Sequence, residues 1–389
     1  MAKPSTSILR VIALKIEFLY RKFHRLIAWL TGYLRLPITC DVYYAIEHEH
    51  GMAIKGRVMR VRKIHEPDPD DSRIRNFLEM FKNWVTPERP YTEVLISWGK
   101  HQLSVKSDRG GYFEAEFESP HQQGPVIFEI PVRGATPVSI DPVTYSPADA
   151  EYLLISDIDD TVLITNAATT LRMIATTLLG NALTRQIFPG TAALYQGLKQ
   201  GTTVEDHPHI NPICYVTSSP FNLHNLVSLI FQTNEIPGGA FLMAAWGMDE
   251  TKWFRHGHRD HKFEAIKKAL SWYPSLPVIL IGDSGEHDTD IYAEVAVKFP
   301  DRIIDVMIRN VCSKSKIAVL RSRWNELVGE DNFFIFSDCM EAAAHLRQRG
   351  RISLSAVEAV AKSIEEADES ILTTLIEPMQ KHLKTEDKN

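Results

Sequence analysis

The sequence predicts an α/β fold in the C-terminal half, with a doubly wound parallel sheet and helices between its strands. Three short apolar runs, Leu153–Ser156, Ile213–Val216 and Val278–Ile281, lack polar alternation. Such runs are typical of strands buried on both faces of a parallel sheet. Each run ends in carboxylate or hydroxyl residues, and helical patterns separate the runs. Further strands are expected at Ile303–Arg309 and Phe333–Phe336.

The polar residues that follow the three runs predict a common site. Asp157 and Asp159 follow the first run, Thr217 follows the second, and Asp283 and Asp288 follow the third. Open α/β sheets bind ligands at the carboxyl ends of their strands, so these side chains are expected to lie together. Two carboxylates spaced two apart reach one cation, and magnesium takes few carboxylates plus substrate phosphate oxygens. An acidic turn with an N-capping threonine is the structural alternative.

Three strings extend this pattern to a known family. They are DIDDTV (Asp157–Val162), YVTSSPFNL (Tyr215–Leu223) and GDSGEHDTDIY (Gly282–Tyr292), with Lys262 between the last two. Their order resembles that of the haloacid dehalogenase superfamily of phosphatases. More closely, the strings resemble the magnesium-dependent phosphatidate phosphatases of the actin-patch type, over about Ala148–Leu346. The resemblance implies a haloacid-dehalogenase-like catalytic domain that uses Mg²⁺ to convert phosphatidic acid to diacylglycerol.

The resemblance also implies catalytic roles. Asp157 is the expected nucleophile, which would form an aspartyl-phosphate. Asp159 is the expected general acid for the departing alkoxide and then the base for water. Thr217 and Lys262 would hold the phosphoryl oxygens, with Ser218 as the alternative to Thr217.

For the metal, the same resemblance implies a set of oxygen ligands. Asp157, Asp159 (through its backbone carbonyl) and Asp283 are the expected ligands, and Asp288 is either a ligand or a residue that orients one. Arg309, at the end of a later strand, is a candidate contact for the phosphate or lipid headgroup.

The N-terminal segment, residues 1–38, is predicted to be a basic amphipathic helix. It holds seven Lys or Arg against Glu17 alone, a net charge of +6 that leaves −12 on the rest of a chain whose total is −6. At about 100° per residue, the charges from Arg10 to Arg35 fall within an arc of roughly 160°. Such a helix favours an anionic phospholipid membrane surface, with packing on the neighbouring domain or in a dimer as the alternative.

Residues 39–147 are predicted to form a β-sandwich, because short strand patterns follow one another between turn signals. One amphipathic helix, Ser72–Trp84, interrupts them, and Pro142–Pro147 is the expected linker. The strand patterns are Asp41–Glu47, Met52–Val61, Thr92–Trp98, His101–Lys106, Tyr112–Phe117 and Val126–Pro131.

Residues 148–350 form the predicted phosphatase domain, and residues 351–389 a helical tail. In the phosphatase domain we expect an apolar helix at Thr169–Gln186, a helix from Phe188 to Leu198 and an insertion at Ile236–His261.

The amino-acid composition of the chain excludes some classes of protein function. Hydrophobic content of 44% and charged content of 24% are ordinary for a soluble globular protein. The four cysteines have no paired spacing, which favours a reducing compartment, so we expect a cytoplasmic protein at the membrane periphery. No basic patch with interleaved aromatics lies outside the first helix, which disfavours nucleic acid. Besides a lipid phosphatase, the alternatives are a phosphatase for a soluble phosphomonoester and a catalytically inactive adaptor.

Overall fold

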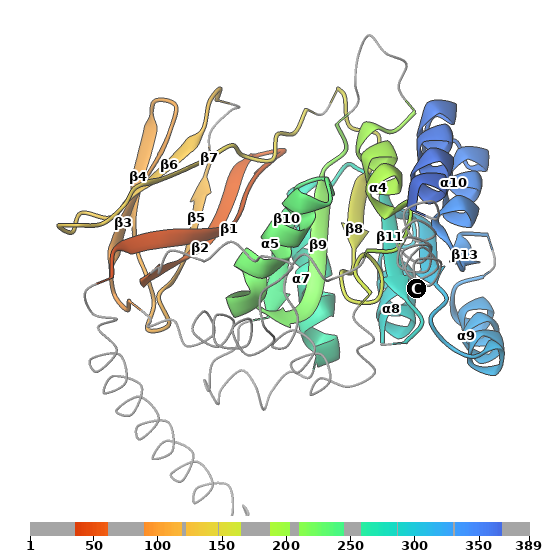
Figure 1. Ribbon diagram of the computed structural model, residues 1–389. Helices are drawn as coiled ribbons and strands as arrows, with labels where there is room; N and C mark the ends of the chain where they lie inside the picture. The colour runs from red at the N-terminus through yellow and green to blue at the C-terminus, as the bar shows by residue number, and fades with distance from the viewer. Residues whose placement is uncertain are drawn as a thin grey trace, which may run out of the picture.

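In the computed structural model, the described residues form two antiparallel sheets followed by one parallel sheet (Figure 1). These residues are 36–60, 89–118, 122–146, 148–164, 187–202, 210–244, 258–285, 287–329 and 331–367. Several predicted segments lie outside the described residues: nearly all of the helix at 1–38, the helices at Ser72–Trp84 and Thr169–Gln186, residues 245–257 of the insertion at Ile236–His261, and residues 368–389 of the tail.

The N-terminal part holds seven strands in two sheets. One sheet has the order β1-β2-β5 and the other the order β4-β3-β6-β7. The strands are β1 (Ile38–His48), β2 (Gly51–Arg60), β3 (Glu93–Trp98), β4 (His101–Lys106), β5 (Tyr112–Phe117), β6 (Val126–Glu129) and β7 (Val138–Ile140). The six predicted strands are confirmed, and β7 was missed because three residues are too few to show alternation.

Both antiparallel sheets contribute side chains to one hydrophobic cluster. Ile54 and Val58 of β2 enter it from the first sheet, and Ile96 and Trp98 of β3 enter it from the second. In β3, buried residues alternate with more exposed ones, as expected of a strand with one face on a core. The described residues thus give two sheets around a shared core, and the β-sandwich itself stays a prediction.

The C-terminal part is built on a six-stranded sheet with the order β10-β9-β8-β11-β12-β13, in which all neighbouring strands are parallel. The chain enters at the middle, adds strands on one side and then returns to add strands on the other. This is the predicted doubly wound arrangement, compatible with a haloacid-dehalogenase-like core, and its switch point lies between β8 and β11. The strands are β8 (Leu153–Ser156), β9 (Ile213–Pro220), β10 (Ala240–Ala244), β11 (Val278–Asp283), β12 (Ile303–Arg309) and β13 (Phe333–Phe336).

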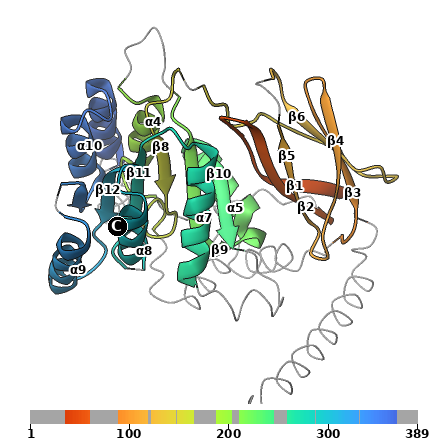
Figure 2. The ribbon, with the colours of Figure 1, turned by 180° about the vertical axis from the view of Figure 1, so that it is seen from behind.

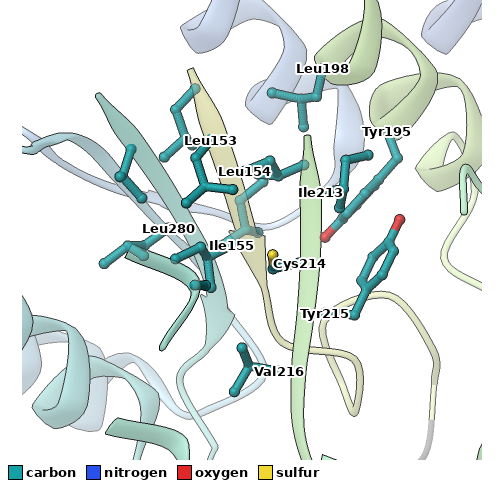
Figure 3. Close-up of a cluster of buried hydrophobic side chains, with 14 of the residues drawn as sticks. Leu153, Leu154, Ile155, Tyr195, Leu198, Ile213, Cys214, Tyr215, Val216 and Leu280 are labelled. Carbon is teal, nitrogen blue, oxygen red and sulfur yellow. The ribbon is translucent and has the colours of Figure 1, made fainter. Parts of the chain in front are cut away.

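Helices cover both faces of this sheet (Figures 1 and 2). They are α4 (Thr191–Gln200), α5 (His224–Thr233) after the short turn η3 (Phe221–Leu223), α7 (His258–Trp272), α8 (Asp288–Lys298), α9 (Lys314–Leu327) and α10 (Cys339–Gln348), followed by a helix at 354–367. All four residues of β8 are buried, which explains its unbroken apolar run. Figure 3 shows Leu154 of β8 and Ile213 of β9 in the core, close to Tyr195 of α4.

The structure corrects two element boundaries. The predicted insertion at Ile236–His261 begins with β10, which pairs with β9 and is therefore an edge strand of the central sheet. Its sequence, AFLMA, is a short apolar run that periodicity cannot assign to a strand or a helix. The helix expected from Phe188 begins instead at Thr191, because Gly190 adopts a left-handed conformation with φ of 79°.

The two parts of the chain are joined along β1. Tyr43 stacks on Phe221 with ring centroids 4.2 Å apart, and Nδ1 of His224 lies 2.8 Å from Oδ1 of Asp41. The described part of the predicted linker, residues 142–146, is held against the same strand, since Val143 pairs with Ile46.

The described start of the predicted tail packs on the α/β part. Ile352, Ala356 and Val360 are buried in the same cluster as Leu198 of α4. Within the described ranges, no helix has the length and hydropathy that crossing a membrane requires.

A buried carboxylate ties β12 to the segment that follows α10 and gives a first prediction. Oδ1 of Asp305 accepts from Nε of Arg349 at 3.0 Å, and Oδ2 accepts from Nε of Arg351 at 2.6 Å. Burial alone would raise the pKa of Asp305, but hydrogen bonds from His345 and Arg351 and the arginine charges outweigh it, so the pKa lies below its usual value.

We expect Asp305→Asn to lower the free energy of unfolding by about 2–4 kcal/mol at neutral pH, because two partly buried arginines lose their counter-charge. Because the pKa of Asp305 is lower in the folded than in the unfolded protein, its carboxylate stabilises the fold at pH values above the unfolded pKa of about 3.9. This stabilisation is lost as the pH falls through the folded-state pKa. The advantage of the native residue should therefore shrink near pH 3. Urea titrations at both pH values check this, with the exposed Asp301→Asn as control, and equal effects of the two substitutions would contradict it.

Candidate functional site

The first strand end is a tight loop that begins with two buried carboxylates. The backbone N–H of Asp157 donates to the carbonyl of Ile281 at 2.9 Å, which continues the pairing of β8 with β11 by one residue. Asp160 then adopts a left-handed conformation with φ of 56°, which Asp tolerates better than most residues. The hydroxyl of Thr161 donates to Oδ2 of Asp157 at 3.2 Å. Thr161 thus tightens the loop around the Asp157 side chain.

The third strand end places two more buried carboxylates beside the first. Asp283 is the last residue of β11, and Asp288 is the first residue of α8. Oδ2 of Asp288 accepts the backbone N–H of Asp283 at 3.3 Å. A Cβ at position 282 would lie 2.6 Å from this same oxygen, so only glycine fits between the strand and the Asp288 carboxylate.

Asp157, Asp283 and Asp288 form a cluster in which one carboxylate oxygen of each residue lies within 4.8 Å of those of the other two. From α7, the Nζ of Lys262 reaches Oδ1 of Asp157 at 2.8 Å and Oδ1 of Asp288 at 2.7 Å. All four side chains are buried. Buried carboxylates at this spacing repel one another, and one ammonium group balances only part of their charge. An oxygen-only donor set of this kind fits a hard divalent cation rather than zinc.

Asp159 points away from this cluster, toward β9. Its Oδ2 accepts from the hydroxyl of Thr217 at 2.8 Å and from that of Ser219 at 2.8 Å. The predicted phosphoryl contact Thr217 therefore holds Asp159 in this structure. Ser218, the alternative, lies between the two hydroxyls on the other face of the strand and is only partly buried.

Ser219 was missed by the sequence analysis. The second strand was expected to end at Val216, but β9 continues to Pro220. Extending the alternation of side chains through Thr217 would have placed Ser219 on the same face as Thr217, and that was the available signal.

Arg309 lies behind the Asp157 loop rather than in the carboxylate cluster. It is 2% exposed, and its Nε donates to the carbonyl of Thr161 at 3.0 Å. Its guanidinium carbon lies 4.0 Å from the ring centroid of Phe188 and 4.9 Å from that of Phe336. The structure thus brings six of the predicted site residues to one sheet edge, and it places Arg309 as a support for the loop.

Together, fold and site define an α/β protein with a buried carboxylate–lysine cluster at the switch point of its sheet. Comparison with known proteins identifies the family that this part resembles. Residues 152–310 match the family model described as the catalytic domain of phosphatidate phosphatase APP1. The resemblance expected from the sequence is thereby confirmed for this part of the chain.

Individual relatives agree with this match. The chain is 26% identical to phosphatidate phosphatase APP1 of Saccharomyces cerevisiae over 286 residues, which cover 70% of this chain and 45% of that protein. It is 30% identical to an uncharacterized protein of Schizosaccharomyces pombe over 162 residues, which cover 41% of this chain and 25% of that protein. The chain thus spans less than half the length of either relative.

Among solved structures, a carbohydrate acetylesterase from Xanthomonas citri aligns with a TM-score of 0.23 and 10% identity, covering 76% of this chain and 74% of that one. At that score the likeness carries no argument about fold or function.

The buried lysine gives a second prediction. Replacing Lys262 by Met would leave Asp157 and Asp288 buried without their shared cation, which costs about 3–5 kcal/mol of unfolding free energy. Chemical denaturation with a chelator present measures this loss. Lys267→Met on the same helix is the matched control, since Lys267 is 57% exposed and its contact with Glu264 at 3.6 Å contributes little. Similar losses in both variants would show that Lys262 does not balance the cluster.

Proposed function

We propose that the chain is a magnesium-dependent phosphatidate phosphatase, which hydrolyses phosphatidic acid to diacylglycerol and phosphate through an aspartyl-phosphate on Asp157. The observation that carries the proposal is the buried cluster of Asp157, Asp283, Asp288 and Lys262 within the segment that matches the APP1 catalytic domain. A phosphoric monoester hydrolase needs a nucleophile, a proton donor and charge neutralisation, and this edge of the sheet offers residues for each.

Asp157 is suited to nucleophilic attack because both of its carboxylate oxygens are oriented. Oδ1 contacts the Lys262 ammonium, and Oδ2 accepts from Thr161. In the first step an Asp157 oxygen forms a bond to phosphorus and the ester oxygen leaves with its electron pair. In the second step water attacks the same phosphorus and the bond to Asp157 breaks, which restores the carboxylate.

Asp159 is the proposed proton carrier of both steps. It gives a proton to the departing alkoxide and takes one from the attacking water. Thr217 and Ser219 fix its carboxylate, so we assign them to positioning Asp159, and we keep Ser218 and Lys262 as the candidates for holding phosphoryl oxygens.

Asp157, Asp283 and Asp288 are the residues that would hold Mg²⁺, with the Asp159 carbonyl as the fourth candidate ligand. When bound there, the ion would neutralise charge on the phosphoryl oxygens. The chain's own contribution is to bring one oxygen of each carboxylate within 4.8 Å of the other two and to bury all three side chains.

The choice of a lipid substrate rests on the family match and on the predicted basic helix at 1–38, which would place a cytoplasmic enzyme at the membrane periphery. A soluble phosphomonoester is the second candidate. An inactive adaptor is disfavoured, because a binding module gains nothing from three carboxylates buried side by side.

Substrate turnover tests the proposal directly. We expect phosphate release from phosphatidate in mixed micelles to depend on Mg²⁺, to stop on chelation and to exceed release from a panel of soluble phosphate esters. Asp157→Asn should lower turnover at least about a thousandfold, because an amide cannot form the aspartyl-phosphate.

Asp160→Asn is the control in the same loop, since Asn also tolerates the left-handed conformation at that position. Turnover that survives in Asp157→Asn, or that continues after exhaustive chelation, would contradict the mechanism.

The role of Ser219 gives a separate prediction. Ser219→Ala removes one of the two hydroxyls that hold Oδ2 of Asp159. We therefore expect turnover to fall by about tenfold where the leaving group needs a proton. The loss should appear with alkyl phosphates, whose alkoxides need a proton, and should be small with p-nitrophenyl phosphate. Steady-state kinetics on both ester types checks this. An equal loss on both would mean that Ser219 supports the fold of the site rather than Asp159.

A further inference from the structure

The outer face of α9 combines exposed apolar and basic side chains. Val319 is 65% exposed, the highest value among large hydrophobic residues in the part of the chain that the structure describes, and Leu327 is 53% exposed. Lys316 and Arg323 are also exposed. The positions 316, 319, 323 and 327 repeat every three or four residues, so these four side chains form one stripe along the helix.

Helix α9 is anchored to the sheet through Trp324. Trp324 is 1% exposed and stacks on Phe333 of β13, with ring centroids 4.5 Å apart and planes at 13°. Arg323 contacts Asp290 of α8 at 2.9 Å while remaining 55% exposed. These contacts hold the helix in place, with the stripe facing the solvent. Single exposed apolar residues are ordinary on a protein surface, but an ordered stripe with interleaved cations is the pattern of a helix that lies in a membrane interface.

The N-terminal end of the stripe lies near the carboxylate cluster. The Nζ of Lys316 donates to the carbonyl of Gly285 at 3.2 Å, and the N–H of Gly285 in turn donates to Oδ1 of Asp283. Val311, which is 39% exposed, leads into α9, and its N–H donates to the hydroxyl of Ser284 at 3.0 Å. Figures 1 and 2 show α9 at the end of the sheet where the loop after β8 also lies.

The charge of this element is opposite to that of the chain. Residues 314–327 contain four Lys or Arg against Glu326 alone, a net charge of +3 in a chain of −6. An anionic surface would attract this helix and repel most of the remaining protein, which orients the molecule as well as holding it.

We propose that this α9 face, defined as Val311, Lys316, Val319, Arg323 and Leu327, docks the active-site edge of the sheet onto an anionic phospholipid bilayer. The choice of a bilayer as the occupant rests on the proposed lipid substrate. The apolar side chains enter the acyl boundary and the cations contact lipid phosphates, so that the Asp283 loop faces the headgroups. This contact is separate from the predicted helix at 1–38 and belongs to the folded α/β part itself.

A fluorophore attached to the face tests the proposal without depending on turnover. The full chain carrying Val319→Cys is labelled with an environment-sensitive dye and mixed with vesicles of phosphatidate and phosphatidylcholine. We expect these vesicles to shift the emission of the dye to shorter wavelength. Vesicles of phosphatidylcholine alone should cause no shift, and high salt should weaken it. All variants also carry Cys312→Ser, because Cys312 is partly exposed and follows Val311 of the face, while Cys40, Cys214 and Cys339 are buried. The Cys312→Ser chain treated with the same dye is the blank.

Leu354→Cys is the matched control, since Leu354 is 57% exposed on the helix at 354–367, which packs on α4 rather than on α9. A blue shift at 319 but not at 354 supports the proposal. No shift at 319, or equal shifts at both positions, overturns it, even if a different part of the chain still binds the vesicles.

Turnover separates this proposal from the proposed function. Val319→Glu combined with Leu327→Glu should lower phosphatidate hydrolysis in vesicles by at least about tenfold and leave hydrolysis of a short-chain, monomeric phosphatidate unchanged. Loss on both substrates would indicate a damaged fold and overturn the docking role. A normal blue shift without any phosphatidate turnover in the unmutated active site would instead refute the proposed function and leave the bilayer contact standing.

Discussion

Charge balance at the switch point of the parallel sheet is the constraint on which the rest of the structure depends. Asp157 and Asp288 are buried beside each other, and each gives its Oδ1 to the same ammonium group on Lys262. Burying such charges is costly unless geometry and hydrogen bonding compensate. Helix α7 must therefore lie against the ends of β8 and β11, and glycine must stand at position 282 so that Asp288 can approach.

This constraint extends through the loop after β8 to the far side of the sheet. Arg309 holds the loop through the carbonyl of Thr161, and the faces of Phe188 and Phe336 cover its guanidinium. The carbonyl and the two aromatic faces offset the cost of burying the Arg309 guanidinium, so this side chain can serve as a rigid support. The last strands, β12 and β13, thus contribute to the position of the nucleophile candidate although they carry none of the clustered carboxylates.

The features that depend on burial and chain order are predictable from the sequence. Strands buried on both faces leave unbroken apolar runs, so β8, β11, β12 and β13 were predicted, and their polar ends pointed to the site. Side-chain direction was not recoverable in the same way. Arg309 ends a strand as predicted, yet its guanidinium turns behind the loop, and Thr217 turns to Asp159. Both directions are set by neighbours far away in sequence.

At the junction between the two parts, the sequence again does not predict the directions of the side chains. Alternation along β1 predicts that Tyr43 and Tyr44 face opposite sides, but a register shift between Val42 and Tyr44 adds a residue to the strand. Both tyrosines therefore join the core of the α/β part, while Ala45 remains in the core between the antiparallel sheets.

Tyr43 stacks on Phe221, which directly follows the end of β9, the strand whose Thr217 and Ser219 hold Asp159. Asp41, which lies on β1 like Tyr43, contacts His224 at the start of α5. The antiparallel part is thus packed against the segment that positions the proton-carrier candidate. A single extra residue in β1 makes this packing geometrically possible, because without it one of the two tyrosines would point back into the antiparallel core.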